Sequence, residues 1–70
     1  MLTQDEETVA VLAEVPPLLV SVQNAARMLA VGRTTVYELI GAGELEAIQI
    51  GRSRRVPVAS LEAFVQRRRG

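Results

Sequence analysis

Two short amphipathic segments, joined by only about three residues, constrain the fold of this chain more than any other feature of its sequence. In the first segment Ser21 is a good helix N-cap, and small or aliphatic residues then recur at the i, i+3, i+4 and i+7 positions from Val22 to Leu29. This spacing predicts a helix that ends near Ala30.

The second segment, residues 33–40, has an apolar stripe at Val36, Leu39 and Ile40 and is followed by Gly41. Glycine is common just past the end of a helix, so a second helix is predicted to stop there. Two short helices with a connection of about three residues are typical of a helix-turn-helix.

A β-hairpin is predicted for residues 45–58. LEAIQI, residues 45–50, alternates well enough to form a strand, and RVPV, residues 55–58, predicts a second strand. The stretch GRSR between them is typical of a turn. Because proline has no N–H to donate to a ladder, Pro57 predicts that the second strand lies at the edge of the sheet.

The last stretch, ASLEAFVQRRRG, predicts a closing helix with Leu61, Phe64 and Val65 on one face. Its three final arginines, residues 67–69, would lie where the helix dipole favours positive charge. The expected fold is therefore α+β and mostly α, with two helices, a hairpin and a closing helix.

Pro16 and Pro17 divide the chain, because two consecutive prolines cannot continue a helix. We expect residues 1–17 to be an acidic and apolar N-terminal extension and residues 18–70 to be the folded domain. The extension fits a short helix better than a strand. Its apolar residues predict contact with a neighbouring copy of the chain; contact with its own domain, or no contact, is the alternative. The candidate contact residues are Val9, Leu12 and Val15.

The formal net charge is zero, but the charges are unevenly distributed. Residues 1–20 carry four carboxylates and no base, whereas residues 21–70 carry all eight arginines and four glutamates. Such a split is typical of a basic binding module with an acidic appendage. Random scatter of charge over a solvated surface is the alternative.

Chain length and residue types exclude several classes of function. Seventy residues make one small domain, in which a deep catalytic cleft is not expected. Without cysteine or histidine, the chain has no disulfide, no thiolate or imidazole metal ligand and no histidine base. We therefore expect no enzyme, no metal, no cofactor and no small-molecule ligand. The apolar stretches are too short to span a bilayer and the N-terminus is acidic, which predicts a cytoplasmic protein without a membrane partner.

The outward face of the second helix is a candidate DNA-reading surface. In a recognition helix, side chains near the helix start enter the major groove while the first N–H groups approach phosphate. An arginine there can form a fork with guanine, and a carboxylate can accept from cytosine N4. A solvated polar surface is the alternative. The candidate residues are Arg33, Thr34, Thr35, Tyr37 and Glu38, with Arg27 on the first helix as a candidate phosphate contact.

The hairpin turn carries a second group of candidates, namely Arg52, Ser53, Arg54 and Arg55. An arginine at the tip of such a wing can enter a minor groove, where the negative potential of A-tracts attracts it. Strand alternation predicts that Arg52 and Arg54 do not share a face with Arg55, so that two of the three contact DNA and the third pairs internally. Charge that keeps an exposed strand edge soluble is the alternative.

Residues 18–65 resemble the excisionase-type, MerR-like winged helix-turn-helix domain. The resemblance is carried by AARMLAV in the first helix, RTTVYELI in the second, GAGELEAIQIG into the wing and RRVPVASLEAF out of it. It implies a small bacterial or phage DNA-binding protein, and many such proteins direct recombination by bending attachment-site DNA for a tyrosine integrase. Two positions depart from the pattern. Gly32 replaces the usual serine N-cap, and Glu38 stands where arginine is frequent.

The leading expectation is a site-specific architectural factor, an excisionase, that binds double-stranded DNA in the nucleoid of a bacterial host. Its expected partners are a tyrosine integrase and further copies of itself on the DNA, because a chain this small contacts few phosphates. A small transcriptional regulator with the same fold is the alternative. A protein–protein adaptor whose basic face binds an acidic partner is a third possibility.

Overall fold

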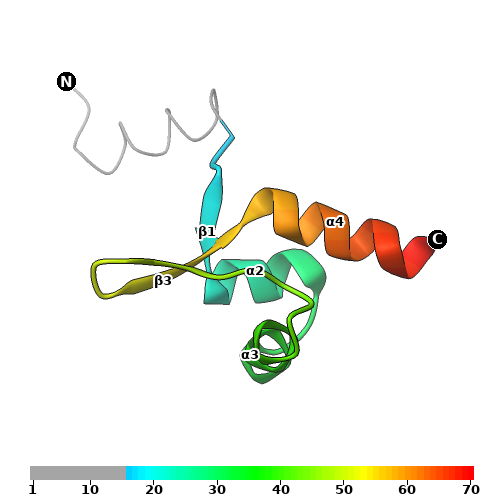
Figure 1. The fold of residues 1–70 in the computed structure, drawn as a ribbon, viewed down its shortest axis with the longest axis horizontal. Coiled ribbons are helices and arrows are strands. Elements are labelled where there is room, and N and C mark those ends of the chain that lie inside the picture. Colours follow the sequence, from blue (N-terminus) through cyan, green and yellow to red (C-terminus); the bar gives the residue numbers. More distant parts are fainter. Residues whose placement is uncertain (1–15) are drawn as a thin grey trace.

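The computed structural model describes residues 16–70, which form three helices and a small antiparallel sheet at one side of them (Figure 1). The predicted mostly helical α+β fold is confirmed, with one strand more than predicted. None of the helices in residues 16–70 is long and apolar enough to cross a membrane. The N-terminal contact candidates Val9, Leu12 and Val15 lie outside the described residues. In chain order the elements are β1 (Leu19–Ser21), α2 (Val22–Leu29), α3 (Arg33–Gly41), β2 (Ile48–Ile50), β3 (Ser53–Pro57) and α4 (Val58–Arg69).

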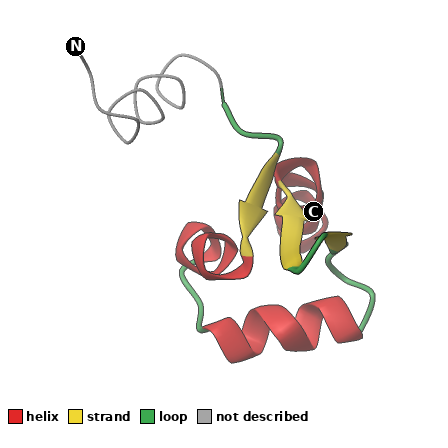
Figure 2. Cartoon of the chain, turned by 90° about the vertical axis from the view of Figure 1, so that its left-hand side faces the viewer, coloured by secondary structure: helices red, strands yellow, loops and turns green. Residues whose placement is uncertain are grey.

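Both ends of α2 follow from its sequence. The Ser21 hydroxyl oxygen accepts a hydrogen bond from the Asn24 N–H at 3.1 Å, which is the predicted N-cap. At the other end Ala30 takes a left-handed conformation, with φ 58° and ψ 42°, and the Val31 N–H donates to the Ala26 carbonyl at 2.9 Å. This termination turns the chain within three residues, so that α3 starts at Arg33 in a different direction from α2 (Figure 2).

The left-handed Ala30 provides a test of this turn. A residue with a Cβ pays roughly 1–2 kcal/mol in this conformation, which glycine avoids. Ala30→Gly is therefore expected to raise the free energy of unfolding by about 0.5–1 kcal/mol, measured by urea denaturation. Ala42→Gly is the control, because Ala42 ends α3 with a negative φ of −82°. An equal effect of the two substitutions would contradict the account of the turn.

Strand β3 is the central strand of the sheet, paired antiparallel with β1 on one side and β2 on the other (Figure 2). The predicted edge position of the second hairpin strand is therefore wrong, because residues 19–21 form a strand that was not predicted. Pro57 is tolerated since β2 pairs no further along β3 than Arg55. On the β1 side, the Val58 N–H continues the ladder to the Leu18 carbonyl at 2.9 Å. Successive residues of an antiparallel strand direct their N–H groups alternately to one neighbour and the other, so the proline nitrogen faces away from β1. On that side β2 has already ended, and no donor is needed.

The hairpin is shorter than predicted, because residues 45–47 do not pair. Leu45 instead lies in the loop before β2, and its side chain is buried in the core with 3% of its surface exposed. Every residue of β2 is exposed, so the hairpin projects beyond the core (Figure 1). Among the residues that the structure describes, the buried core is Val20, Val22, Ala25, Ala26, Val36, Leu45, Val56 and Leu61.

The predicted apolar face of α4 differs in depth along its width. Leu61 is buried and Phe64 packs against the core, whereas Val65 is 39% exposed. Val65 lines one surface hollow with Leu61 and another with Phe64, so the three residues lie on one side of α4, with Val65 at its margin.

Candidate nucleic-acid interface

The orientation of α3 is set by its buried side. Val36 is fully buried, and Leu39 and Ile40 pack against the core. The opposite side of the helix is therefore presented to solvent along one margin of the domain (Figure 2). The exposed side chains on it are the predicted Arg33, Thr34, Tyr37 and Glu38.

Thr35 lies apart from the other four candidates on α3. It lines a surface hollow together with Val31, Leu39 and Phe64, on the flank of α3 that faces α4. Each residue of a helix is rotated by about 100° from the one before it, so Thr35 lies on the same side of α3 as Leu39 and not on the side of Thr34. The structure thus brings four of the five predicted α3 residues onto one face and separates Thr35 from them.

The first turn of α3 leaves backbone donors free for a ligand. Gly32 is extended and gives no side-chain cap, and the Val36 N–H donates to the Gly32 carbonyl at 3.3 Å. The N–H groups of residues 33–35 precede this bond and have no partner within the helix. They lie next to Arg33 and Thr34, so the start of α3 combines positive charge with donors that suit a phosphate oxygen.

The hairpin ends in a two-residue turn, Gly51 and Arg52, because Ile50 pairs directly with Ser53. Gly51 has φ +59°, as the first position of a tight hairpin turn of this kind requires. The Gln49 side-chain amide donates to the Gly51 carbonyl at 3.1 Å and braces the turn. Arg52 is consequently exposed at the tip of a braced projection.

Arg54 and Arg55 lie on opposite faces of β3, as alternation requires. Arg54 is exposed opposite Gln49, whereas Arg55 is half-buried between Ser21 and Ile48 on the outer face of the sheet. The predicted separation of these two arginines is confirmed. An internal ion-pair partner for Arg55 is not found among residues 16–70, where the single ion pair joins Glu44 to Arg68.

The two remaining candidates occupy less prominent positions. Ser53 is half-buried where β3 begins, opposite Ile50. Arg27 is exposed in the last turn of α2, one turn before the connection to α3. Its charge also suits the C-terminal end of the α2 dipole.

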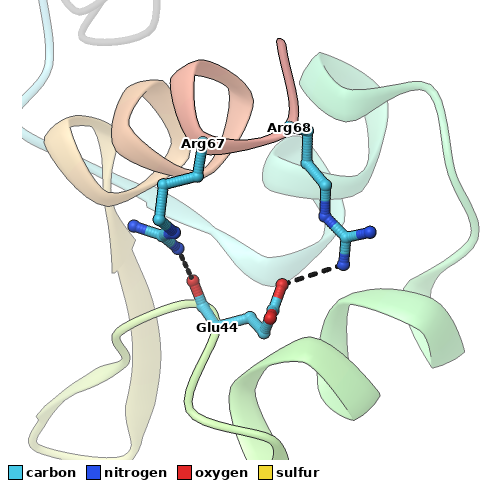
Figure 3. A network of polar contacts seen from close by, with 3 residues as sticks. All are labelled: Glu44, Arg67 and Arg68. Atoms are coloured by element: carbon cyan, nitrogen blue, oxygen red, sulfur yellow. Dashed lines mark hydrogen bonds and ion pairs between the residues drawn. The ribbon is translucent and has the colours of Figure 1, made fainter. Parts of the chain in front are cut away.

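A network that the sequence patterns do not reveal ties the loop between α3 and β2 to α4 (Figure 3). Arg67 donates to the Glu44 backbone carbonyl at 2.7 Å, and Arg68 donates to the Glu44 carboxylate at 2.9 Å. The Arg68 guanidinium also lies 5.1 Å from the centre of the Phe64 ring. Because this loop joins α3 to the hairpin, these contacts with α4 contribute to how the two candidate surfaces are placed relative to each other. Glu44 and Arg68 are 24 positions apart, and no local pattern in the sequence predicts that two such distant residues form an ion pair.

The domain has two short helices, the second of which exposes a polar face, and a hairpin with an arginine at its tip. This arrangement defines the class of small helix-turn-helix domains. Comparison with known families agrees with this class. Residues 19–69 match the family model described as a helix-turn-helix domain, and the chain belongs to that family.

Two relatives illustrate the membership. The chain is 40% identical over 50 residues to a probable excisionase of Saccharopolyspora erythraea, a match that covers 71% of this chain and 51% of the relative. It is 38% identical over 55 residues to an excisionase of Streptomyces ambofaciens, covering 79% of this chain and 89% of the relative. The chain thus spans about half the length of the first relative and most of the second.

Proposed function

We propose that this protein is a winged helix-turn-helix DNA-binding factor that acts as an excisionase: it binds and bends attachment-site DNA and promotes excision by a tyrosine integrase. The observation that carries the proposal is the pairing of an exposed, uncapped α3 with a braced arginine hairpin on one small domain. The two relatives, one named a probable excisionase and the other an excisionase, support the same function.

In the proposed complex α3 enters the major groove with its N-terminal end. Arg33 forms a fork with a guanine edge, and the free N–H groups of the first turn bind phosphate. Arg52 and Arg54 enter the neighbouring minor groove, where a narrow groove concentrates negative potential. Holding both grooves at once favours DNA that curves towards the protein, and a bend of this kind is what an architectural factor contributes.

The proposed role involves no catalysis by this chain. Strand cleavage and joining belong to the integrase, while several copies of this protein side by side on the DNA shape the complex. Residues 18–70 are the proposed DNA-binding domain and residues 1–17 an extension to it. The proposed place of action is the bacterial cytoplasm, on nucleoid DNA.

An excision assay tests this function directly. The purified protein, the integrase encoded nearest to its gene and the matching attachment-site DNA are combined, and excised product is measured with and without the protein. The proposal expects excision to depend on the protein, and a circular-permutation gel to show bent DNA. Specific binding with no bend and no effect on excision would favour a small transcriptional regulator instead.

The wing contact has its own test in the salt dependence of DNA binding. Each phosphate neutralised contributes about 0.9 to the slope of log K against log salt. Replacing both Arg52 and Arg54 by alanine is therefore expected to lower that slope by about 1.8. The matched control compares two single variants, Arg52→Ala and Arg69→Ala, because Arg69 is exposed at the end of α4, outside the proposed interface, and its loss removes the same charge. Arg52→Ala is expected to lower the slope by about 0.9, and an equal loss from Arg69→Ala would mean that the wing acts only through overall charge.

A further inference from the structure

Glu38 is the one carboxylate of α3, and it is exposed on the side that the proposed complex turns towards DNA. Among residues 16–70 the single ion pair joins Glu44 to Arg68, so no cation pairs with Glu38 there. Glu38 also begins the last turn of the helix, where the helix dipole favours positive charge. Close to phosphates, a carboxylate adds repulsion. Unless the DNA donates a hydrogen bond to it, Glu38 therefore weakens binding.

Helical geometry places Glu38 at the middle of the outward side of α3. Val36 is fully buried, and each residue of a helix is rotated by about 100° from the one before it. Thr34 and Glu38 lie two residues before and two residues after Val36, so both point about 160° away from it. A helix that lies in a major groove turns this side towards the base edges.

The length of α3 separates the contacts of Glu38 from those of Arg33. The two residues are five positions apart, which is about 7.5 Å along the helix axis. With α3 lying along the groove, this distance corresponds to about two base-pair steps of about 3.4 Å each. The two side chains therefore contact different base pairs, and the base preference of Glu38 can be measured separately from that of Arg33.

We propose that Glu38 is a specificity-determining residue that accepts a hydrogen bond from the N4 amino group of a cytosine, an inference that rests on the proposed function. In the major groove cytosine N4 and adenine N6 are donors, whereas guanine N7 and O6 and thymine O4 are acceptors. Adenine also places its N7 acceptor next to N6, where it repels a carboxylate. Cytosine has a C–H group at the neighbouring C5 position, so it suits Glu38 best.

The same carboxylate rejects the other bases. Facing guanine or thymine, it would lose water and meet lone pairs without gaining a hydrogen bond, which costs free energy. Glu38 therefore lowers the affinity for DNA in general and raises the discrimination between sites. Arg33 differs in this respect, because its positive charge attracts any phosphate as well as guanine.

A panel of duplexes, each with one base pair of the bound site replaced, tests this contact by fluorescence anisotropy. The unsubstituted chain is expected to lose roughly five- to tenfold in affinity when one particular cytosine is replaced by thymine. Glu38→Gln is expected to prefer adenine at that position, because a glutamine amide pairs with adenine N6 and N7. The matched control is Glu62→Gln, which removes the same charge from an exposed residue of α4 and is expected to keep the preference for cytosine.

A cytosine methylated on N4 isolates the hydrogen bond itself. This base keeps the hydrogen that pairs with guanine and carries a methyl group in place of the hydrogen that points into the major groove. The unsubstituted chain is expected to bind the methylated duplex roughly five- to tenfold more weakly than the unmethylated one. Glu38→Ala is expected to bind both duplexes equally, since it has no carboxylate to accept the hydrogen bond.

Several results would overturn the inference. If Glu38→Gln keeps the base preference of the unsubstituted chain at every position, Glu38 does not read a base, although specific binding by the unsubstituted chain still supports the proposed function. An equal change of preference in Glu62→Gln, or an equal effect of N4 methylation on Glu38→Ala, would assign the result to something other than this contact. If the unsubstituted chain binds no duplex specifically, both the inference and the proposed function are wrong.

Discussion

Replacing Leu45 by alanine is expected to cost the domain about 2–5 kcal/mol of unfolding free energy, enough to unfold much of the population at 37 °C. Leu45 is 3% exposed and is one of the eight buried hydrophobic residues found among residues 16–70. Its buried side chain anchors the loop that follows α3, where the Leu45 N–H donates to the Leu39 carbonyl at 3.2 Å. The cavity would therefore weaken the core and release the link between α3 and the hairpin together.

Leu18→Ala is the matched control for this substitution. Leu18 is 85% exposed, so the same change of residue is expected to alter the unfolding free energy by less than about 0.5 kcal/mol. Urea denaturation followed by circular dichroism measures both variants. If Leu45→Ala unfolds at the urea concentration of the unsubstituted chain, the placement of residues 42–47 is wrong.

Arg33→Ala is expected to weaken binding to the specific DNA site by about 1–3 kcal/mol, while binding to a scrambled duplex changes much less. Arg33 is exposed in the first turn of α3, and within residues 16–70 it has no ion-pair partner. Its guanidinium is therefore available for a bidentate contact with guanine. Fluorescence anisotropy on the two duplexes measures both affinities at one fixed salt concentration.

Arg27→Ala is the comparison for this second prediction. Arg27 is also exposed, but it lies on α2, and as a phosphate contact it is expected to weaken binding to both duplexes alike. If Arg33→Ala shows that same uniform loss, Arg33 contacts phosphate and does not read a base.

The helices could be predicted because their signals are local. The Ser21 cap and the apolar spacing after it fix α2, and the stripe through Val36 fixes the exposed face of α3. Strand β1 could not be predicted in this way, since three residues are too few to show alternation. Because β1 was not predicted, Pro57 led to the wrong prediction that β3 is an edge strand. Whether a strand is paired on one side or on both depends on residues distant in the sequence.

The part of the candidate site that depends on local helical geometry could also be predicted from the sequence. Arg33, Tyr37 and Glu38 are on the exposed side of α3 because helical geometry alone puts them there. The position of Thr35 beside Phe64 depends on where α4 packs, and the bonds of Glu44 to Arg67 and Arg68 depend on the same packing. Contacts of this kind come from tertiary structure, which one sequence does not encode in a local pattern.

The central claim, that α3 and the arginine hairpin together bind a specific DNA site, is tested most directly by fluorescence anisotropy across a salt series. The protein is titrated onto duplexes from the DNA that flanks its gene and any neighbouring attachment site, with a scrambled duplex as the reference. We expect tight binding to one duplex, with an affinity that falls steeply as salt rises, and the slope counts the phosphates contacted. Folded protein that binds no duplex even at low salt, or binds all of them equally, would contradict the claim.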